Sequence, residues 1–237
     1  MKVEGEFTDF LNFIIQENKF DLSIKEKFLF LSYENYLSDI KPENKFIIYE
    51  DWWVRKPEIV KSKIKSTLGI SKRLFARKCT VKKITKPVAD LFLEENHIYG
   101  TTKSKIKYGL FYENKLYAVA AFAGQRQFRD GSRSGELLRY CNKNSCTIIG
   151  GLDKLLQAYS KEYQPDTLMT YIDADWGKGK AFLKLGFEQT EIKPASLFYV
   201  NKKTGLRIAA KYFDDFEKQK EYVKIRNSGS IKMLRTL

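Results

Sequence analysis

The stretch from Ser134 to Phe187 constrains the fold of this 237-residue chain more than any other. It opens with a strand-like run and a loop that ends in Gly150-Gly151. Apolar residues then recur at the i, i+3, i+4, i+7 spacing of one helix face: Leu152, Leu155, Leu156 and Tyr159. A second strand-like run, 167–172, ends at Asp173. Strand, glycine loop, helix and strand in this order bury a helix against a sheet, which predicts an α+β fold.

The Gly150-Gly151 pair stands at the start of the predicted helix. The first amides of a helix have no internal partner and carry partial positive charge, and glycine lets a ligand approach the backbone closely. A phosphate, a pyrophosphate or a DNA backbone fits such a place. The alternative is a plain loop whose glycines only make the turn, and the spacing of a lone glycine pair by itself favours this alternative.

The composition limits the size and the location of the protein. With 43% hydrophobic residues, including 17 Phe and 14 Tyr, the chain can bury one sizeable core, or one domain with a small appendage. No apolar run approaches the about 18 residues of a membrane span, and the acidic start lacks an apolar signal core. Three cysteines without zinc-type spacing indicate reduced thiols. We therefore expect a cytoplasmic protein (of the host, if a phage encodes it) without a membrane partner.

The charge points to a polyanionic partner. Forty-three Lys and Arg against 29 Asp and Glu give a net charge of +14, which favours nucleic acid over a membrane surface. A lysine-rich proteome is the alternative source of this excess. The single histidine, His97, argues against metal sites built on several imidazoles, which leaves carboxylate-bound magnesium or chemistry without a metal. No metal-binding residues are predicted.

The N-terminal part carries a first family resemblance. Residues 1–49 are expected to form a small α/β element, and a basic helix is expected over 57–68. The run YEDWWVRKPEIVKSKIKSTLGISKRLFARKC, from Tyr49 to Cys79, resembles the end of a very-short-patch-repair-like endonuclease domain, as found in phage homing endonucleases. The resemblance implies that residues 1–76 are a truncated nuclease-like segment, with the carboxylates needed for cleavage not recognisable upstream.

The remainder, 77–237, resembles a second family. Its expected order is strand, helix, two strands, strand, glycine loop, helix, strand, helix, strand, strand, and a terminal hairpin is expected to turn at 227–230. This order, with NHIYG, GELLRYCN, IIGG, TYIDADW and LKLGF, resembles the phage GNAT-like domain of homing-endonuclease-associated proteins and, more distantly, the Mom DNA-modification enzymes. The fold implied is a GNAT-like mixed sheet flanked by helices, with a small N-terminal α/β appendage.

The resemblance to Mom implies an enzyme that transfers an acyl-derived group to a DNA base amine and so protects phage DNA from restriction. Catalytic roles are implied at five positions: His97, Glu136, Arg139, Tyr171 and Asp173. Arg139 would hold a phosphate or carboxylate, Glu136 would orient it or act as a base, and Asp173 would accept a proton. The loop Ile149, Gly150 and Gly151 matches the position that holds acetyl-CoA or another acyl donor, without the family's full glycine pattern.

Contacts with double-stranded DNA, with the target base flipped out, are expected from basic residues. The candidates are Lys103, Lys105, Arg126, Arg129 and Arg133. Two other functions stay open: a homing-endonuclease-like protein, and a DNA-binding protein without catalysis. Structural roles also stay open for single residues, with His97 as a helix cap, Glu136 and Arg139 as an ion pair, and Asp175 and Trp176 as capping and packing groups.

Overall fold

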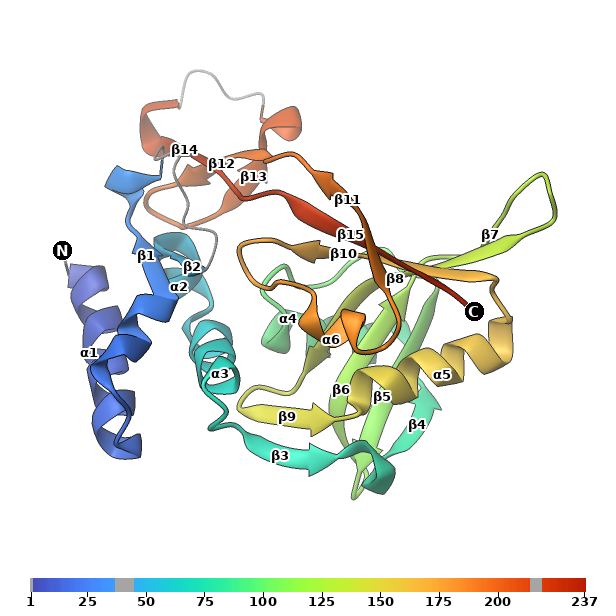
Figure 1. Cartoon of the computed structure of the whole chain (residues 1–237). Helices are drawn as coiled ribbons and strands as arrows, with labels where there is room; N and C mark the ends of the chain where they lie inside the picture. The colour runs from blue at the N-terminus through green and yellow to red at the C-terminus, as the bar shows by residue number, and fades with distance from the viewer. Residues whose placement is uncertain (1, 37–44, 214–218) are drawn as a thin grey trace. The chain divides into compact units, whose positions relative to one another are not determined.

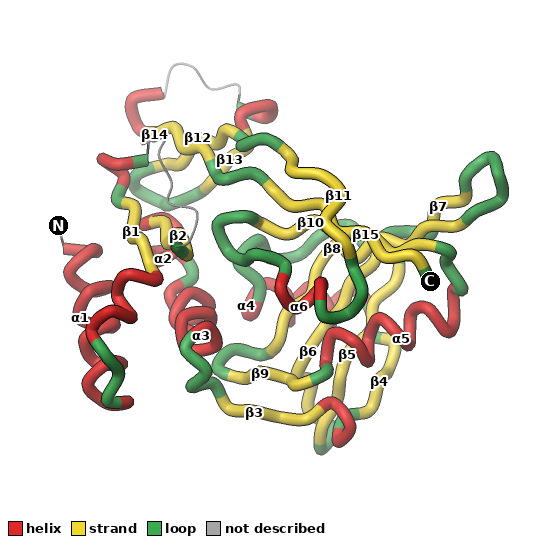
Figure 2. Tube along the Cα trace, viewed as in Figure 1, coloured by secondary structure: helices red, strands yellow, loops and turns green. Residues whose placement is uncertain are grey.

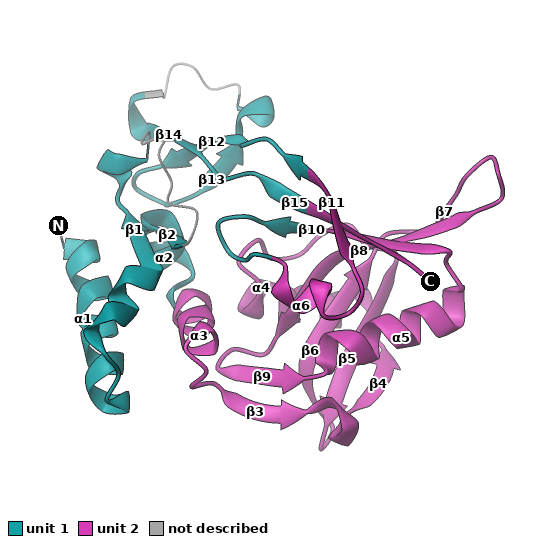
Figure 3. Cartoon of the chain, in the orientation of Figure 1, with its two compact units in different colours: residues 1–57, 172–178, 192–231 teal, residues 58–171, 179–191, 232–237 magenta. Residues whose placement is uncertain are grey.

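The computed structural model describes residues 2–36, 45–213 and 219–237 (Figure 1). The chain divides into two compact units, each assembled from three segments (Figure 3). Unit 1 comprises residues 1–57, 172–178 and 192–231, and unit 2 comprises 58–171, 179–191 and 232–237. The predicted modules 1–76 and 77–237 stay a prediction.

The main sheet has the strand order β11-β15-β10-β8-β6-β5-β4, with β7 paired to β8. In chain order these strands are β4 (Thr80–Lys83), β5 (Ile106–Tyr112), β6 (Lys115–Phe122), β7 (Arg126–Gln127), β8 (Arg133–Asn142), β10 (Thr167–Asp173), β11 (Glu188–Lys193) and β15 (Ser230–Thr236). Strands β4, β5, β6 and β8 pair antiparallel, and β8 pairs parallel with β10. The predicted α+β class with a mixed sheet flanked by helices is therefore confirmed.

Two helices cover opposite faces of this sheet, with α5 (Gly151–Tyr163) in front and α4 (Lys86–Asn96) behind in Figure 1. On the α4 face, Ala89, Phe92 and Leu93 pack on Val119 and Ala121 of β6. On the α5 face, the Tyr159 ring stacks on Phe122 with centroids 4.1 Å apart. Because side chains alternate along a strand, neighbouring residues of β6 serve the two faces. The helix period from Leu152 to Tyr159 is thus the buried face of α5, as predicted.

Shorter elements complete unit 2 (Figure 2). They are α3 (Pro57–Thr67, whose first residue belongs to unit 1), β3 (Lys72–Phe75), the 3-10 turn η3 (Ala76–Lys78), β9 (Cys146–Ile149) and α6 (Lys180–Leu183). Strands β3 and β9 pair parallel, with Phe75 opposite Ile149. This pairing brings η3 beside the start of α5, where the Lys154 ammonium donates to the carbonyls of Ala76 (2.9 Å) and Cys79 (2.6 Å).

Unit 1 contains two small sheets. Its elements are α1 (Lys2–Asn18), η1 (Leu22–Lys27), β1 (Phe28–Leu31), η2 (Tyr33–Asn35), β2 (Phe46–Tyr49), α2 (Glu50–Arg55), β12 (Leu197–Asn201), β13 (Arg207–Ala209), η4 (Ala210–Tyr212), η5 (Gln219–Glu221) and β14 (Tyr222–Arg226). β1 and β2 pair parallel, and β13-β12-β14 pair antiparallel. The small α/β element expected at the N-terminus is present.

The predicted terminal hairpin at 227–230 is wrong. β14 pairs with β12, whereas β15 lies between β10 and β11, so the two strands enter different sheets. Gly229, at φ +82, has the carbonyl oxygen of Lys193 only 2.1 Å from where a Cβ would stand. The backbone of residues 193–194 therefore packs against Gly229. The chain runs past this backbone from β14 into β15 and does not fold back to pair the two strands.

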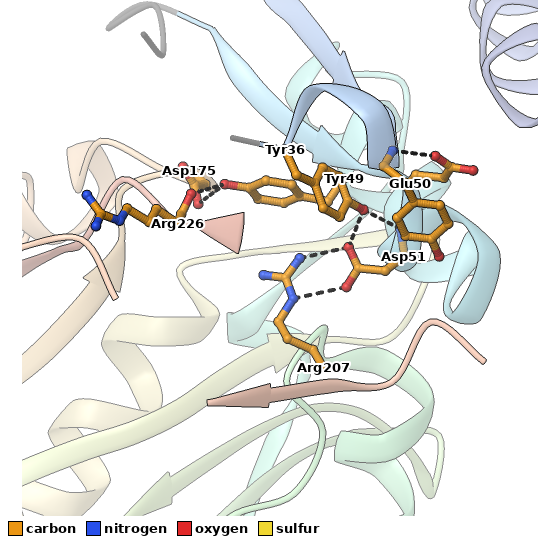
Figure 4. A network of polar contacts seen from close by, with 8 residues as sticks. Tyr36, Tyr49, Glu50, Asp51, Asp175, Arg207 and Arg226 are labelled. Atoms are coloured by element: carbon orange, nitrogen blue, oxygen red, sulfur yellow. Dashed lines mark hydrogen bonds and ion pairs between the residues drawn. The ribbon is translucent and has the colours of Figure 1, made fainter. Parts of the chain in front are cut away.

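A buried polar network holds unit 1 together (Figure 4). The Arg207 guanidinium donates to both carboxylate oxygens of Asp51, from Nε at 2.9 Å and from Nη2 at 2.8 Å. Tyr36 donates its hydroxyl to Asp51 (2.8 Å), and the rings of Trp52 and Tyr49 lie 4.6 and 4.7 Å from the Arg207 Cζ. The acidic-aromatic turn that resembled a nuclease is thus a structural element here, with its buried carboxylate fully engaged.

Candidate functional site

Strands β8 and β10 pair over four residues only. The parallel register runs from Ser134 opposite Thr167 to Leu137 opposite Thr170, where the Thr170 hydroxyl also donates to the Leu137 carbonyl (2.8 Å). Beyond that point β8 continues to Asn142 in register with β6 alone. The residues 138–142 are all partly exposed, and we call their backbone on the β10 side the open edge of β8.

A β-bulge lies where the open edge begins. Leu137 stands opposite Phe122 and Arg139 opposite Ala121, so Leu138 is the extra residue on β8. Further along, the Lys143 amide donates to the Tyr117 carbonyl (2.7 Å) on the β6 side. Because peptide groups alternate in direction along an antiparallel strand, those of Tyr140 and Asn142 point to the open edge. The bulge therefore marks the end of the ladder and leaves hydrogen-bonding groups facing away from β6.

The bulge also decides which side chains share a face. Arg139 lies opposite Ala121, a member of the α4 cluster, so its side chain is on the α4 face. A Cβ on Gly135 would meet Tyr159 of α5 at 2.6 Å, so the next residue, Glu136, is also on the α4 face. Without the extra residue, two positions three apart on a strand would point to opposite faces. The predicted pair Glu136 and Arg139 is thus brought to one face.

Tyr171 joins the same face. A Cβ on Gly135 would also meet the Leu168 side chain at 2.9 Å, which places Leu168 on the α5 face. Three residues later along β10, the Tyr171 side chain points to the α4 face, and it is 41% exposed. Three of the five predicted catalytic residues in the chain, Glu136, Arg139 and Tyr171, therefore share one side of the sheet.

Arg139 makes few contacts for a half-buried cation. Its Nη1 donates to the carbonyl of the bulged residue, Leu138 (2.9 Å), and its Cζ lies 5.9 Å from the centroid of the Tyr99 ring. Its Nε is buried without a hydrogen-bond acceptor among the described residues, and burial lowers the pKa of its guanidinium. No ion pair joins it to Glu136 in the described part of the chain, so the structural ion pair considered from the sequence is wrong.

His97 and Tyr99 lie at the end of α4. The His97 amide donates to the Leu93 carbonyl (2.8 Å), so His97 is the C-cap of the helix. Its Nδ1 accepts the Tyr99 amide (3.2 Å), and the two rings are 6.2 Å apart. Through Tyr99, the structure connects His97 with Arg139. The sequence prediction included His97 and missed Tyr99, although NHIYG contains both.

Gly150 and Gly151 occupy different environments at the start of α5. Gly150 is exposed at φ +75, and a Cβ there would have only Ala76 Cβ nearby, at 3.7 Å. Gly151 is buried, and a Cβ there would stand 2.9 Å from Ile148 Cβ and 3.0 Å from the Tyr140 hydroxyl. Gly150 is needed for the positive φ of the turn, whereas Gly151 is needed because a larger side chain would clash with Ile148 and Tyr140. Tyr140, which the sequence prediction missed, lies under the first turn of α5 and so joins that turn to the open edge.

The surroundings of this turn are basic and partly apolar. Ile149, the third predicted donor-loop residue, is 44% exposed and pairs with Phe75, which is equally exposed. Arg77 and Lys78 are exposed and follow Ala76, the residue beside Gly150. Tyr140 donates its hydroxyl to the Asn142 side chain (2.8 Å), and burial raises the pKa of this tyrosine.

Asp173 belongs to unit 1 and shapes the turn after β10. Its carboxylate accepts the Asp175 amide (2.9 Å), and its carbonyl accepts the amides of Trp176 (3.1 Å) and Gly177 (3.0 Å). Asp175 is buried and accepts the Tyr49 hydroxyl (2.9 Å), while Trp176 packs on a tryptophan, Trp52, at 5.2 Å. Asp175 and Trp176 have the structural roles considered from the sequence. The catalytic role of Asp173 stays a prediction.

Four of the five predicted DNA-binding residues, all except Lys103, lie on or beside one hairpin. The hairpin formed by β7 and the start of β8 projects from the sheet (Figure 2), with Phe128 42% exposed and the Arg126 Cζ 5.0 Å from its ring centroid. Arg129 is exposed beside Phe128, and the Arg133 amide donates to the Asp166 carboxylate (2.6 Å). Exposed Lys103 and Lys105 precede β5, and Lys105 lies at the base of the hairpin beside Gly124.

Across 2–36, 45–213 and 219–237, no group of three or more His, Cys, Asp or Glu side chains is placed to hold a metal ion. Within the same ranges, no helix is both long enough and apolar enough to cross a membrane.

Comparison with known proteins gives structural neighbours only. No family model and no curated protein matches the chain. Similar solved structures include the ribosomal-protein-S18-alanine N-acetyltransferase of Escherichia coli (15% identity, 67% of this chain, 93% of that chain, TM-score 0.44). A GNAT family acetyltransferase from Elizabethkingia anophelis with acetyl-CoA bound (15%, 68%, 99%, 0.40) and Arabidopsis thaliana Naa50 with the bisubstrate analogue CoA-Ac-MVNAL (9%, 68%, 99%, 0.42) are also similar.

These identities and TM-scores are too low to transfer a substrate or a mechanism. Apart from the added short strands β7 and β9, the chain's own order of elements from β4 to β12 is the one predicted: strand, helix, two strands, strand, glycine loop, helix, strand, helix, strand, strand. The order of elements expected for a GNAT-like mixed sheet flanked by helices is therefore present, and the site is interpreted from its own residues.

Proposed function

We propose that this protein is an acyltransferase that holds an acyl-coenzyme A donor at the open edge of β8 and transfers its acyl-derived group to a base amine of DNA. The observation that carries the proposal is the end of the β8–β10 ladder at the Leu138 bulge, next to the first turn of α5. Hydrogen-bonding groups released from a sheet beside a helix N-terminus suit a ligand with amides and a diphosphate.

The donor side is built from α5 and the open edge. Gly150 presents no side chain, so a diphosphate can reach the first amides of α5, and Arg77 and Lys78 add positive charge nearby. The peptide groups of Tyr140 and Asn142 can pair with the amides of the donor's extended arm. When bound, the donor supplies a thioester whose carbonyl carbon accepts the amine.

The acceptor side is the α4 face, where Glu136, Arg139 and Tyr171 lie together. As the new C–N bond forms and the C–S bond breaks, the amine loses one proton and the departing sulfur takes one. In this proposal Glu136 accepts the proton and Tyr171 donates one to sulfur, and solvent restores both. Asp173 is the alternative proton acceptor, and separate variants distinguish the two carboxylates.

DNA is the proposed acceptor because of the charge and the projecting hairpin. A net charge of +14 favours phosphate contacts, and Arg126 and Arg129 belong to the hairpin, with Lys105 at its base. The reacting amine of a stacked base is out of reach, so the target base is expected to be flipped. The same hairpin favours a second function, a DNA-binding protein without catalysis, which the turn-forming role of Asp173 also fits.

Donor binding is tested by titrating acetyl-CoA into the protein calorimetrically. Gly150→Ala adds a side chain at a positive φ beside the proposed diphosphate site, and we expect its affinity to fall about tenfold or more. Gly131→Ala is the matched control, since Gly131 has φ +85 and open space around it in the distant hairpin. Equal binding by both variants would contradict the donor site.

The acceptor is tested by incubating plasmid DNA with the protein and acetyl-CoA, digesting it to nucleosides and measuring their masses. The expected result is a new, heavier nucleoside that disappears with Glu136→Gln or Asp173→Asn. Unmodified nucleosides together with salt-sensitive DNA binding would support the non-catalytic alternative instead.

A further inference from the structure

Arg139 is a half-buried cation without a charged partner in the described part of the chain. It contacts the carbonyl of its backbone neighbour, Leu138, and the Tyr99 ring. Its Nε is buried and has no acceptor among the described residues. Glu136, on the same face of the sheet, forms no ion pair with it. The arginine therefore bears the cost of desolvation with little compensation from the protein itself.

Such a group is uncommon because burial of an uncompensated charge is costly. Buried charges in proteins are generally paired, and an unsatisfied buried donor calls for an explanation in each case. A neutral side chain at this position would avoid the cost, so the charge points to a partner from outside the chain. An anion fits, because an opposite charge offsets the desolvation of a guanidinium more fully than a neutral acceptor does.

The geometry narrows the kind of anion. A guanidinium is a planar fork with five N–H donors that matches two oxygens side by side. Nη1 is turned to the Leu138 carbonyl and the Tyr99 ring lies near the guanidinium, so these contacts limit its orientation. The edge that carries Nε remains for a ligand. Two oxygens on one centre, as in phosphate or carboxylate, fit that edge better than a single acceptor does.

We infer that Arg139 binds an oxyanion, a phosphate or carboxylate group of the acceptor, on the α4 face of the sheet. The placement of this anion on the acceptor rests on the proposed transferase function, whereas anion binding itself does not. For a DNA acceptor the group is a phosphodiester next to the flipped base. For an amino-acid or peptide acceptor it is a carboxylate.

The Arg139 guanidinium can be observed directly by NMR through its Nε–Hε signal, assigned by its loss in Arg139→Lys. Inorganic phosphate and sodium acetate are titrated separately at constant ionic strength with chloride. We expect the Arg139 signal to shift and saturate with at least one of them. An Arg139 signal that stays still, or that only follows the shifts of exposed arginines, would overturn the inference.

Arg73 supplies the comparison within the same spectra. Like Arg139 it donates to a backbone carbonyl, that of Gly69, at 3.5 Å, but it is exposed. We expect its signal to move little and without saturation. The wild-type spectrum carries the test by itself, so the result stands even if Arg139→Lys folds poorly, because the signal is then assigned through Arg139→Gln.

Further arms identify the source of the anion. The dinucleotide d(ApA) carries a phosphodiester and deoxyadenosine does not, so a shift with the dinucleotide alone indicates nucleic acid. A shift with acetate but not with phosphate or dinucleotide indicates a carboxylate acceptor, and it would remove DNA from the proposed function while leaving the oxyanion site in place. Saturable binding in a protein that transfers no acyl group would separate the two proposals in the same way.

Discussion

One buried or half-buried arginine from each unit can be compared, and the two differ in whether a carboxylate partner neutralises the charge. In unit 1, Arg207 meets Asp51 through two hydrogen bonds of 2.8 and 2.9 Å, with side chains only 9% and 1% exposed. In unit 2, Arg139 meets a carbonyl and the Tyr99 ring, and no acid in the described residues. The paired cation is a structural element. The unpaired one costs stability, and a bound anion would offset that cost.

The largest effect is expected at the paired cation. Asp51→Ala leaves the Arg207 charge buried and removes the acceptor of the Tyr36 hydroxyl, so we expect a loss of about 3–5 kcal/mol in the free energy of unfolding. Urea unfolding measures it. The double variant Asp51→Ala with Arg207→Met removes both charges and should lose clearly less. Equal losses in the single and double variants would show that the unpaired Arg207 charge is not the cause of the lost stability.

The second largest effect is expected at alkaline pH, where the free energy of unfolding should fall because buried tyrosines of unit 1 lose their protons. Burial, with Asp51 and Asp175 nearby, raises the pKa values of Tyr36 and Tyr49 above the ordinary 10, and that of Tyr33 to about 12. Since the folded state holds these protons more tightly, stability is intact below pH 10 and is lost as the pH rises above it. The slope is about 1.4 kcal/mol per pH unit for each tyrosine that stays protonated, or about 3 kcal/mol at pH 11 for Tyr36 and Tyr49 together.

This loss is measured by urea unfolding at a series of pH values, together with the ultraviolet absorbance of tyrosinate. The absorbance of the buried tyrosinates should appear only as the protein unfolds. Unchanged stability between pH 9 and pH 11 would contradict the account of unit 1.

Packing at the start of α5 should give an intermediate effect. In Gly151→Ala the new methyl group stands 2.9 Å from Ile148 Cβ and 3.0 Å from the Tyr140 hydroxyl, so we expect a loss of about 1–3 kcal/mol. Thermal unfolding measures it against Gly5→Ala, where nothing lies within 4 Å. A Gly151→Ala protein as stable as that control would mean that the turn is looser than described.

The smallest effect is expected at the unpaired cation. Arg139→Met gives up one hydrogen bond to Leu138 but also removes a desolvation cost, so unfolding in chloride should change by less than about 1 kcal/mol. Stabilisation by added phosphate or acetate should disappear in the same variant. A loss as large as that of Asp51→Ala would place Arg139 with Arg207 as a structural residue.

Some of this organisation follows from local sequence patterns. The apolar spacing from Leu152 to Tyr159 predicted α5 and its buried face, and Gly150 predicted the turn before it. The Thr85 and Pro87 pair marks the start of α4 as such residues commonly do. These features depend on residues close in sequence, so a single chain suffices to predict them.

Other features depend on distant contacts or on one irregular residue. Asp51 and Arg207 are 156 positions apart, and nothing in either segment points to the other. The extra residue at Leu138 brings Glu136 and Arg139 to one face, against the simple alternation of a strand. The turn at 227–230 had the composition of a hairpin turn, but β14 pairs with β12 in a small sheet and β15 belongs to the main sheet. Tyr99 and Tyr140 were missed because their roles come from neighbours across the fold.

The claim on which the account depends most is that the open edge of β8 and the first turn of α5 receive the donor. Hydrogen exchange, resolved by residue and measured with and without acetyl-CoA, tests it most directly. The account predicts slower exchange at the amides of Tyr140, Asn142 and Gly151, with the β7–β8 hairpin unchanged. Protection elsewhere, with these three amides unaffected by saturating acetyl-CoA, would contradict it.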